Sequence, residues 1–200
     1  MTLPTSIKNV IEELSKLPSI GPRQATRLAF FLVNLGAQDI AILGKSISAL
    51  ANLKLCERCF MVHDNQGSTC NICADENRDQ STIMIMEKET DLLSVENTRK
   101  FRGRYLIVGP IGKIGILEDW QKLRLQALKT YIAKQFNGKA KEIILAFNPT
   151  SHGDLSAGSI AKELAPLTDK VSRLGRGLPT GGEIEFADEE TLGSAVERRS

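Results

Sequence analysis

Four cysteines carry the clearest chemical signal in this 200-residue sequence. Cys56, Cys59, Cys70 and Cys73 form the pattern C-x2-C-x10-C-x2-C within one short segment. Each C-x2-C pair can bring two thiolates to one ion, and two pairs complete a tetrahedral site that leaves no position for a substrate water. We therefore expect one structural Zn²⁺ here, with free thiols or two disulfides as the alternatives. His63, between the pairs, could compete as a ligand but is expected to be a solvated loop residue.

Carboxylates follow the apolar run 83–86, with Glu87 at its end and Asp91 just beyond, before a helical stretch. This arrangement resembles the first motif of Toprim domains, the α/β units of primases, topoisomerases and a group of nucleases. Catalytic members hold Mg²⁺ with this glutamate and a later Asp-x-Asp, because a hard cation with a phosphate substrate needs clustered carboxylates. Here Asn148 and Thr150 stand where the two aspartates would be. The alternative role for Glu87 and Asp91 is a solvated strand end and a helix cap.

A third candidate site lies in "LPSIGPRQATRLAFFL" (17–32), two helices joined by a Gly/Pro turn. The stretch resembles a helix-hairpin-helix, a widespread DNA-binding unit. We expect Gly21 to adopt a backbone geometry closed to other residues and to leave the amides of the second helix free for a phosphate. Arg23 and Arg27 are one helical turn apart and can reach the same DNA backbone, independently of base sequence. The alternative is a plain αα-hairpin with solvated arginines.

The elements that must position these residues follow from the apolar periodicity. Helices are predicted over 6–17, from about 22 to Gly36, and after Asp39 as an N-cap. Short apolar runs, which indicate strands, alternate with helical stretches in the second part of the chain. The runs are 83–86, 105–108 and 143–147, with a further possible strand near 170–174, and the helical stretches are 90–99, 118–136 and 155–165. That alternation is typical of a parallel α/β unit. We predict four modules: a helix-hairpin-helix DNA-binding module over 1–55, a four-cysteine zinc finger over 56–79, a Toprim-like α/β domain over 80–172 and a C-terminal oligomerisation segment over 173–200.

Composition excludes several classes of protein. The formal net charge of +2 is too small to indicate nucleic-acid binding by itself, so a DNA-binding surface must be local. No signal peptide or membrane-spanning stretch is visible, which favours the cytoplasm. "GPIGKIG" (109–115) matches neither common phosphate-binding loop, and no serine or cysteine nucleophile arrangement is supported once the cysteines bind metal.

The order of hairpin, four-cysteine site and Toprim-like domain, closed by "GRGLPTGG" and "FADEETL", resembles the RecR family of bacterial recombination proteins over nearly the whole chain. The resemblance implies a mediator without catalytic activity, which acts with RecO, and with RecF in many bacteria, to load a recombinase onto single-stranded DNA at the nucleoid. It also implies dimers or ring-shaped tetramers formed through the terminal regions. Arg23 and Arg27 would face DNA, and Glu87, Asp91, His152 and Asp154 would form a partner-binding acidic face.

The chain departs from that family at two places on the expected partner face. After Asn-Pro-Thr the sequence reads Ser-His-Gly-Asp, so His152 replaces a carboxylate, and 109–117 reads "GPIGKIGIL". His152 could make the face pH-sensitive, although an exposed loop histidine is the plainer interpretation. Two rival hypotheses remain: a Mg²⁺-dependent Toprim nuclease or primase-like enzyme, and a zinc-containing ring protein that no longer contacts DNA.

Overall fold

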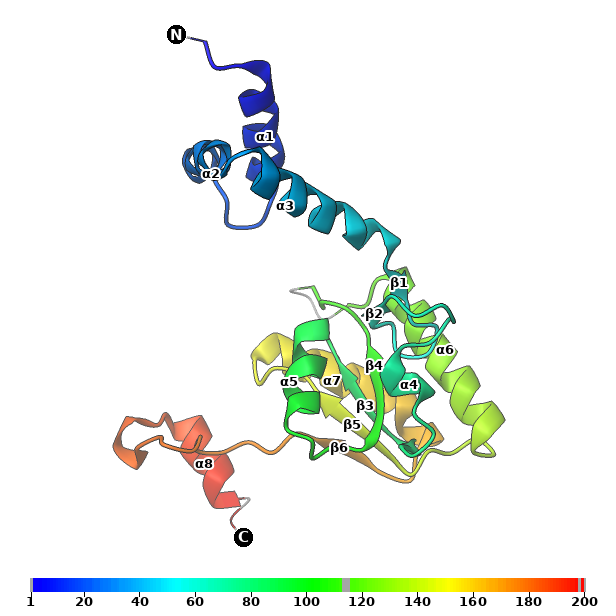
Figure 1. Cartoon of the computed structure of the whole chain (residues 1–200). Coiled ribbons are helices and arrows are strands. Elements are labelled where there is room, and N and C mark those ends of the chain that lie inside the picture. The colour runs from blue at the N-terminus through cyan, green and yellow to red at the C-terminus, as the bar shows by residue number, and fades with distance from the viewer. Residues whose placement is uncertain (1, 113–115, 198, 200) are drawn as a thin grey trace. The chain divides into compact units, whose positions relative to one another are not determined.

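The computed structural model describes residues 2–112, 116–197 and 199 and divides the chain into two compact units, Met1–Leu53 and Lys54–Ser200 (Figure 1). Each unit is described by itself. Residues 113–115 of the "GPIGKIG" stretch lie outside the described residues. The mixed helix-and-sheet architecture with a parallel sheet confirms the predicted fold class.

The N-terminal unit consists of the helices α1 (Thr5–Ser15), α2 (Pro22–Leu35) and α3 (Ala37–Ala49), followed by the short helix η1 (Leu50–Asn52). Gly36 ends α2 with φ of 90°, a left-handed conformation that favours glycine. The predicted N-cap at Asp39 is wrong: the N-cap of α3 is Gly36, three residues earlier, and Asp39 lies in the first turn.

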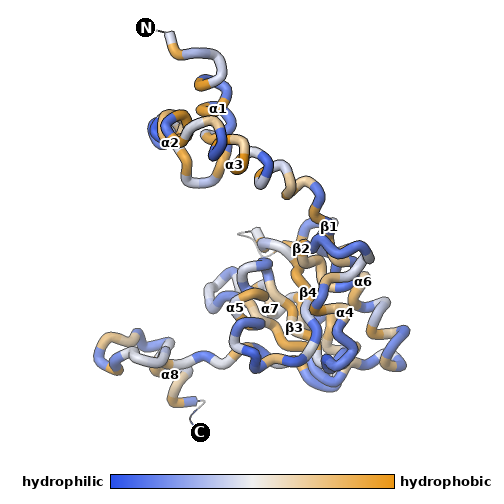
Figure 2. The backbone as a smooth tube through the Cα atoms, in the orientation of Figure 1, coloured by the Kyte–Doolittle hydropathy of each residue, from blue (hydrophilic) through white to orange (hydrophobic). Residues whose placement is uncertain are grey.

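This unit buries very little of its apolar surface. Within residues 2–53 only Ala25 and Ala29 are buried, both on α2. Orange, hydrophobic segments nevertheless run along its helices (Figure 2). The exposed large apolar side chains on α2 and α3 are Phe30, Phe31, Val33, Leu35, Ile40, Ile42, Leu43 and Ile47. Exposed apolar patches of this kind are typical of surfaces through which proteins interact.

A four-stranded parallel sheet forms the second unit, in the order β4-β3-β5-β6. Its strands are β3 (Asp79–Met86), β4 (Gly103–Ile107), β5 (Glu142–Ala146) and β6 (Val171–Arg173). The helices α5 (Glu89–Asn97), α6 (Asp119–Gln135) and α7 (Ser151–Leu164) connect them, and η2 (Ala165–Leu167) follows α7. All four predicted strands and three connecting helices are present, and α7 begins four residues earlier than predicted.

Alternating side chains of the strands build two separate cores, one on each face of the sheet. Ile83 and Ile85 of β3 point into a core shared with α6 and α7, which supply Leu128 and Ile160 among others. Met84 and Met86 point to the opposite face, where they pack with α5 and with all four cysteines. The cysteine segment is therefore part of a sheet core.

The cysteine segment consists of the antiparallel pair β1 (Lys54–Leu55) and β2 (Val62–His63) and the one-turn helix α4 (Asn71–Ala74). At the other end of the unit, η3 (Ile184–Phe186) and α8 (Glu189–Glu197) follow β6. Asp188 caps α8, since its Oδ1 accepts the Thr191 backbone N–H at 2.8 Å. Ile184 and Phe186 are 68% and 80% exposed. No helix among the described residues is long and apolar enough to cross a membrane.

An ion pair between buried Arg78 and half-buried Glu96 fastens α5 to the sheet. The Arg78 guanidinium donates two hydrogen bonds to the Glu96 carboxylate, at 2.7 and 2.9 Å, and its Nε donates to the Gly103 carbonyl. The Tyr105 hydroxyl donates to the same carboxylate at 2.7 Å. Hydrogen bonding from Arg78 lowers the pKa of Glu96.

We expect Glu96→Gln to destabilise the protein by about 2–3 kcal/mol at pH 7, because it leaves a buried arginine without its counter-charge. The lowered pKa means that the carboxylate stabilises the fold above its unfolded pKa and stops doing so as pH falls through the folded value. The gap between wild type and variant should therefore shrink below pH 4 in urea unfolding. An equal gap at pH 7 and at pH 3, or no gap larger than that of exposed Glu185→Gln, would contradict this role.

Candidate functional site

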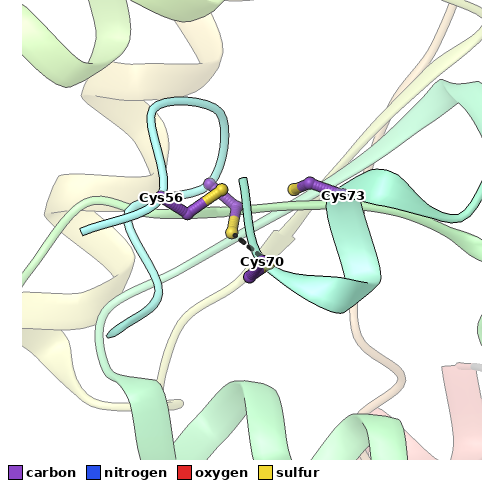
Figure 3. A group of neighbouring side chains, drawn as sticks. Cys56, Cys70 and Cys73 are labelled. Atoms are coloured by element: carbon purple, nitrogen blue, oxygen red, sulfur yellow. Dashed lines mark hydrogen bonds between the residues drawn. The ribbon is translucent and has the colours of Figure 1, made fainter. Parts of the chain in front are cut away.

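The four cysteine side chains form one group. Figure 3 shows three of them, Cys56, Cys70 and Cys73, as neighbours. Their sulfur atoms all lie within 4.8 Å of one another, and the Sγ atoms of Cys59 and Cys70 are 3.5 Å apart. All four residues are buried. Cys56 and Cys59 come from the loop between β1 and β2. Cys70 is the N-cap of α4, and Cys73 lies within that helix. A loop and a one-turn helix thus deliver two thiols each, and the two C-x2-C pairs come together as the sequence spacing predicts.

This arrangement fits a tetrahedral metal ion. Four thiolates at about 2.3 Å from one zinc place their sulfurs about 3.8 Å apart, within the separations found here. Hydrogen bonding between the thiols lowers the pKa of Cys56 and raises that of Cys59, because the cluster favours one thiolate and resists a second. A divalent cation removes that conflict by compensating the negative charge. The four cysteines can therefore hold a metal ion.

The prediction that His63 is a solvated loop residue is wrong. It is 8% exposed on β2, and its Nδ1 accepts the Asn65 backbone N–H at 3.2 Å. Its Nε2 is buried without a hydrogen-bond partner among the described residues. The sequence prediction failed because strand β2 is only two residues long and gives no periodicity signal.

The carboxyl end of β3 carries Glu87, which lines a cavity of about 180 Å³ together with Asn148, Thr150 and His152. Asp91 turns away from that cavity and caps α5: its Oδ2 accepts the Lys88 backbone N–H at 3.1 Å. Within the part of the chain that the structure describes, the cysteines form the one group of three or more His, Cys, Asp or Glu side chains close enough to share an ion. Glu87 is therefore not part of such a group within the described residues.

His152 and Asp154 lie in the first turn of α7, not in a loop, because Thr150 caps the helix by accepting the Gly153 N–H at 3.1 Å. Gly153 is required here, since an added Cβ would lie 2.1 Å from the Asn148 carbonyl oxygen. Asp154 accepts hydrogen bonds from two arginines that no sequence motif indicated, Arg173 at 2.5 Å and Arg176.

These arginines change the electrostatics of the expected acidic face. Hydrogen bonding from Arg176 and Arg173 lowers the pKa of Asp154. Both arginines also line a cavity of about 290 Å³ that includes Asp91 and the ends of β3 and β5. The face is therefore of mixed charge, with Glu87 and His152 on one cavity and Asp91 on another. The only sequence signal for the arginines is their position at and just after the last predicted strand.

In the hairpin, the predicted unusual backbone at Gly21 is wrong. Gly21 has φ of −82° and ψ of 169°, which any residue can adopt, and the positive φ of the turn belongs to Ser19 at 63°. No atom would lie within 4 Å of a Cβ at Gly21, so this side of the turn is open. Arg23 and Arg27 are both exposed on α2.

The start of α2 offers donors next to those arginines. Pro22 is its first residue, and the N–H groups of the first turn have no acceptor within the helix. Open space at Gly21 and the two exposed guanidinium groups of Arg23 and Arg27 therefore lie on the same helix as these N–H groups.

Comparisons with known proteins agree with this layout. The family model "RecR, helix-hairpin-helix" matches residues 7–51, the Toprim domain model residues 81–175, and "RecR, C-terminal" residues 177–200. Three proteins named recombination protein RecR are similar along their length: 38% identity in Frankia casuarinae (96% of this chain, 95% of that protein), 40% in Paenarthrobacter aurescens (97% and 96%) and 39% in Lactococcus lactis subsp. lactis (100% and 98%). At this identity and coverage, the chain belongs to the RecR family of recombination proteins.

Proposed function

We propose that this protein is a recombination mediator in DNA repair, which binds DNA through its hairpin and assists a recombinase without performing chemistry itself. It acts with a RecO-like protein, and with a RecF-like protein where one is present, to load recombinase onto single-stranded DNA. Its place of work is the nucleoid in the cytoplasm, where that DNA lies. The observation that carries the proposal is the pair of exposed arginines, Arg23 and Arg27, beside the open start of α2.

DNA binding is expected to be independent of base sequence. Arg23, Arg27 and the amides after Gly21 suit phosphate oxygens, which carry no sequence information. The affinity should therefore come mostly from counterion release and fall steeply as salt rises.

The absence of catalysis is supported by the strand ends of the α/β domain. Asn148 and Thr150 replace the carboxylates that would complete a Mg²⁺ site with Glu87. Neutral oxygens bind Mg²⁺ too weakly to replace charged ones at a site for phosphate chemistry. The same surface, with Glu87, Asp91, His152 and Asp154, is proposed instead as the face that meets partner proteins.

Zn²⁺ is the metal proposed for the cysteine site, because four thiolates in a closed tetrahedral set suit a structural zinc. Its role follows from the core: the cysteines pack with Met84, Met86 and Leu92, so the ion stiffens one face of the sheet. The closed set of ligands leaves no coordination position for a substrate.

A homo-oligomer, either a dimer or a ring-shaped tetramer, is proposed from the exposed apolar side chains at both ends of the chain. On α3, Ile40, Leu43 and Ile47 are all exposed, and near the C-terminus Ile184 and Phe186 are too. Two separate apolar surfaces per chain allow two kinds of contact, which is what a closed ring requires.

Recombinase loading tests the function against the enzymatic rival. Recombinase is added to single-stranded DNA covered by single-strand-binding protein, with RecO and Mg²⁺ present, and both recombinase occupancy and DNA length are measured. We expect this protein to raise the occupancy several-fold and to leave the DNA intact. DNA cleavage or synthesis that depends on Mg²⁺ or Mn²⁺ and disappears in Glu87→Ala would instead identify a Toprim enzyme, and unchanged occupancy would contradict the mediator role.

A further inference from the structure

The loop that carries Cys56 and Cys59 wraps around one edge of the sheet. Strand β4 is the outermost strand in the order β4-β3-β5-β6, and at this edge the Ile107 N–H donates to the Cys59 carbonyl at 2.9 Å. Cys59 itself packs in the core that contains α5, whereas the next residue, Phe60, packs against the core that contains α6 and α7. The loop therefore contacts both faces of the sheet.

Arg124, a half-buried residue of α6, joins this loop to the start of its own helix. Its Nη1 donates to the Ile107 carbonyl at 2.9 Å, so Ile107 holds Cys59 through its N–H and Arg124 through its C=O. The guanidinium carbon of Arg124 lies 4.7 Å from the centre of the Phe60 ring and 4.8 Å from that of the Trp120 ring. A guanidinium group is attracted to aromatic faces at such distances. One arginine therefore connects the cysteine loop to Trp120.

Trp120 and its neighbour Gln121 hold the backbone that follows β4. The Trp120 ring lies directly against Gly109, because a Cβ added there would lie 2.0 Å from the ring atom Cη2. The buried Gln121 side chain donates from its Nε2 to the Pro110 carbonyl at 3.0 Å and to the Gly109 carbonyl at 3.3 Å. The position of this backbone therefore depends on the first turn of α6, which Arg124 ties to the cysteine loop.

Ile111 continues this backbone and lines the cavity of about 180 Å³ that also includes Glu87 and His152. We propose that Arg124 is a positioning residue that couples the cysteine loop to this cavity; the inference rests on the metal and on the partner-binding face proposed above. When the cysteines hold metal, the loop and its Phe60 ring are fixed. Without metal the Phe60 ring leaves Arg124, and Trp120 and the backbone up to Ile111 move with it. Partner binding therefore depends on the metal, although the cysteines do not line the cavity.

Trp120 is the single tryptophan of the chain, so its fluorescence reports this contact directly. The emission of the full-length protein and its quenching by acrylamide are measured with Zn²⁺ bound and after a chelator has removed it. In wild type, metal removal should shift the emission to longer wavelength and increase the quenching. Arg124→Met keeps an unbranched side chain but removes the guanidinium group. This variant should bind Zn²⁺ like wild type, and its emission should no longer respond to the metal.

Two further variants and a partner complete the experiment. Phe60→Leu removes the other ring that contacts Arg124 and should behave like Arg124→Met. Lys134→Met removes a positive charge from an exposed position of the same helix and should respond to metal like wild type. The affinity of wild type for RecO should fall roughly 2- to 30-fold when metal is removed. Arg124→Met should bind RecO at the lower level with and without metal.

The variants separate coupling from simple structural support. A metal-dependent Trp120 signal in wild type that is lost in Arg124→Met and in Phe60→Leu supports the coupling. Three results overturn it and leave the metal site as proposed: no response in wild type, a full response in Arg124→Met, or loss of Zn²⁺ binding in that variant. If RecO does not bind wild type, the proposed partner is wrong, and the Trp120 signal still decides the coupling. A wild type that binds no metal overturns both the inference and the metal centre.

Discussion

Replacing Cys59 with serine is expected to abolish metal binding and to cost the protein most of its thermal stability. Cys59 is fully buried, and its sulfur lies 3.5 Å from that of Cys70 at the centre of the cluster. Binding of a structural zinc contributes roughly 10–16 kcal/mol to small domains of this kind. Because the cysteines share a core with β3 and α5, loss of the ion should loosen one whole face of the sheet.

Elemental analysis and thermal unfolding check this prediction together. Wild type should retain about one zinc per chain after dialysis, whereas Cys59→Ser should retain almost none and unfold at a much lower temperature. His63→Gln is the matched control, because His63 is buried within the same segment but outside the ligand set. Full metal content in Cys59→Ser, or loss of metal in His63→Gln, would contradict a four-cysteine site.

Placing a charge on the exposed apolar face of α3 is expected to break the oligomer. Ile47 is 59% exposed and lies with Ile40 and Leu43 on a unit that buries only Ala25 and Ala29 among its described residues. An apolar surface of this extent is stable in water only when covered, and a buried aspartate at its centre would have no partner. Ile47→Asp should therefore lower the solution mass by at least half.

Light scattering after size-exclusion chromatography measures that mass. Phe186→Asp should remove the second proposed contact, the one made near the C-terminus. Each variant alone should therefore leave a smaller assembly, and the double variant should leave single chains. Leu123→Asp introduces the same charge at a side chain that is 70% exposed on α6, away from either end of the chain, and should not change the mass. A wild-type mass equal to one chain, or an assembly unaffected by both variants, would contradict the proposed oligomer.

The fold class was predictable because local patterns determine it. The runs 83–86 and 143–147 are continuous and apolar, which is typical of strands covered on both faces, and each is followed by an amphipathic stretch. The cysteine site could also be predicted from the sequence, because the spacing of two C-x2-C pairs identifies the four ligands independently of the surrounding residues. In these cases the information lies within a few neighbouring residues.

Other features depend on contacts between distant residues, and the sequence predicted them poorly. The sequence suggests that Asp154 is an unpaired carboxylate. In the structure, however, Arg173 and Arg176, about twenty positions later, donate hydrogen bonds to it and compensate its charge. The positive φ was assigned to Gly21 by residue type, but the hairpin places it at Ser19. His63 on β2 and Arg104 on β4 are polar residues that the fold buries. The cysteine loop docks on β4 through the hydrogen bond from the Ile107 N–H to the Cys59 carbonyl, a contact that no local pattern encodes.

The salt dependence of DNA affinity in the wild type and in Arg23→Ala/Arg27→Ala tests the central claim most directly. Wild type should bind DNA of unrelated sequences alike, with log affinity falling linearly as log salt concentration rises. The double variant should bind more weakly, and its slope should be shallower by about two for each hairpin that contacts a duplex. Lys134→Ala/Lys162→Ala removes the same charge from exposed positions of α6 and α7 and should match wild type. If the arginine variant and wild type share one slope and one affinity, the hairpin does not bind DNA and the account is wrong.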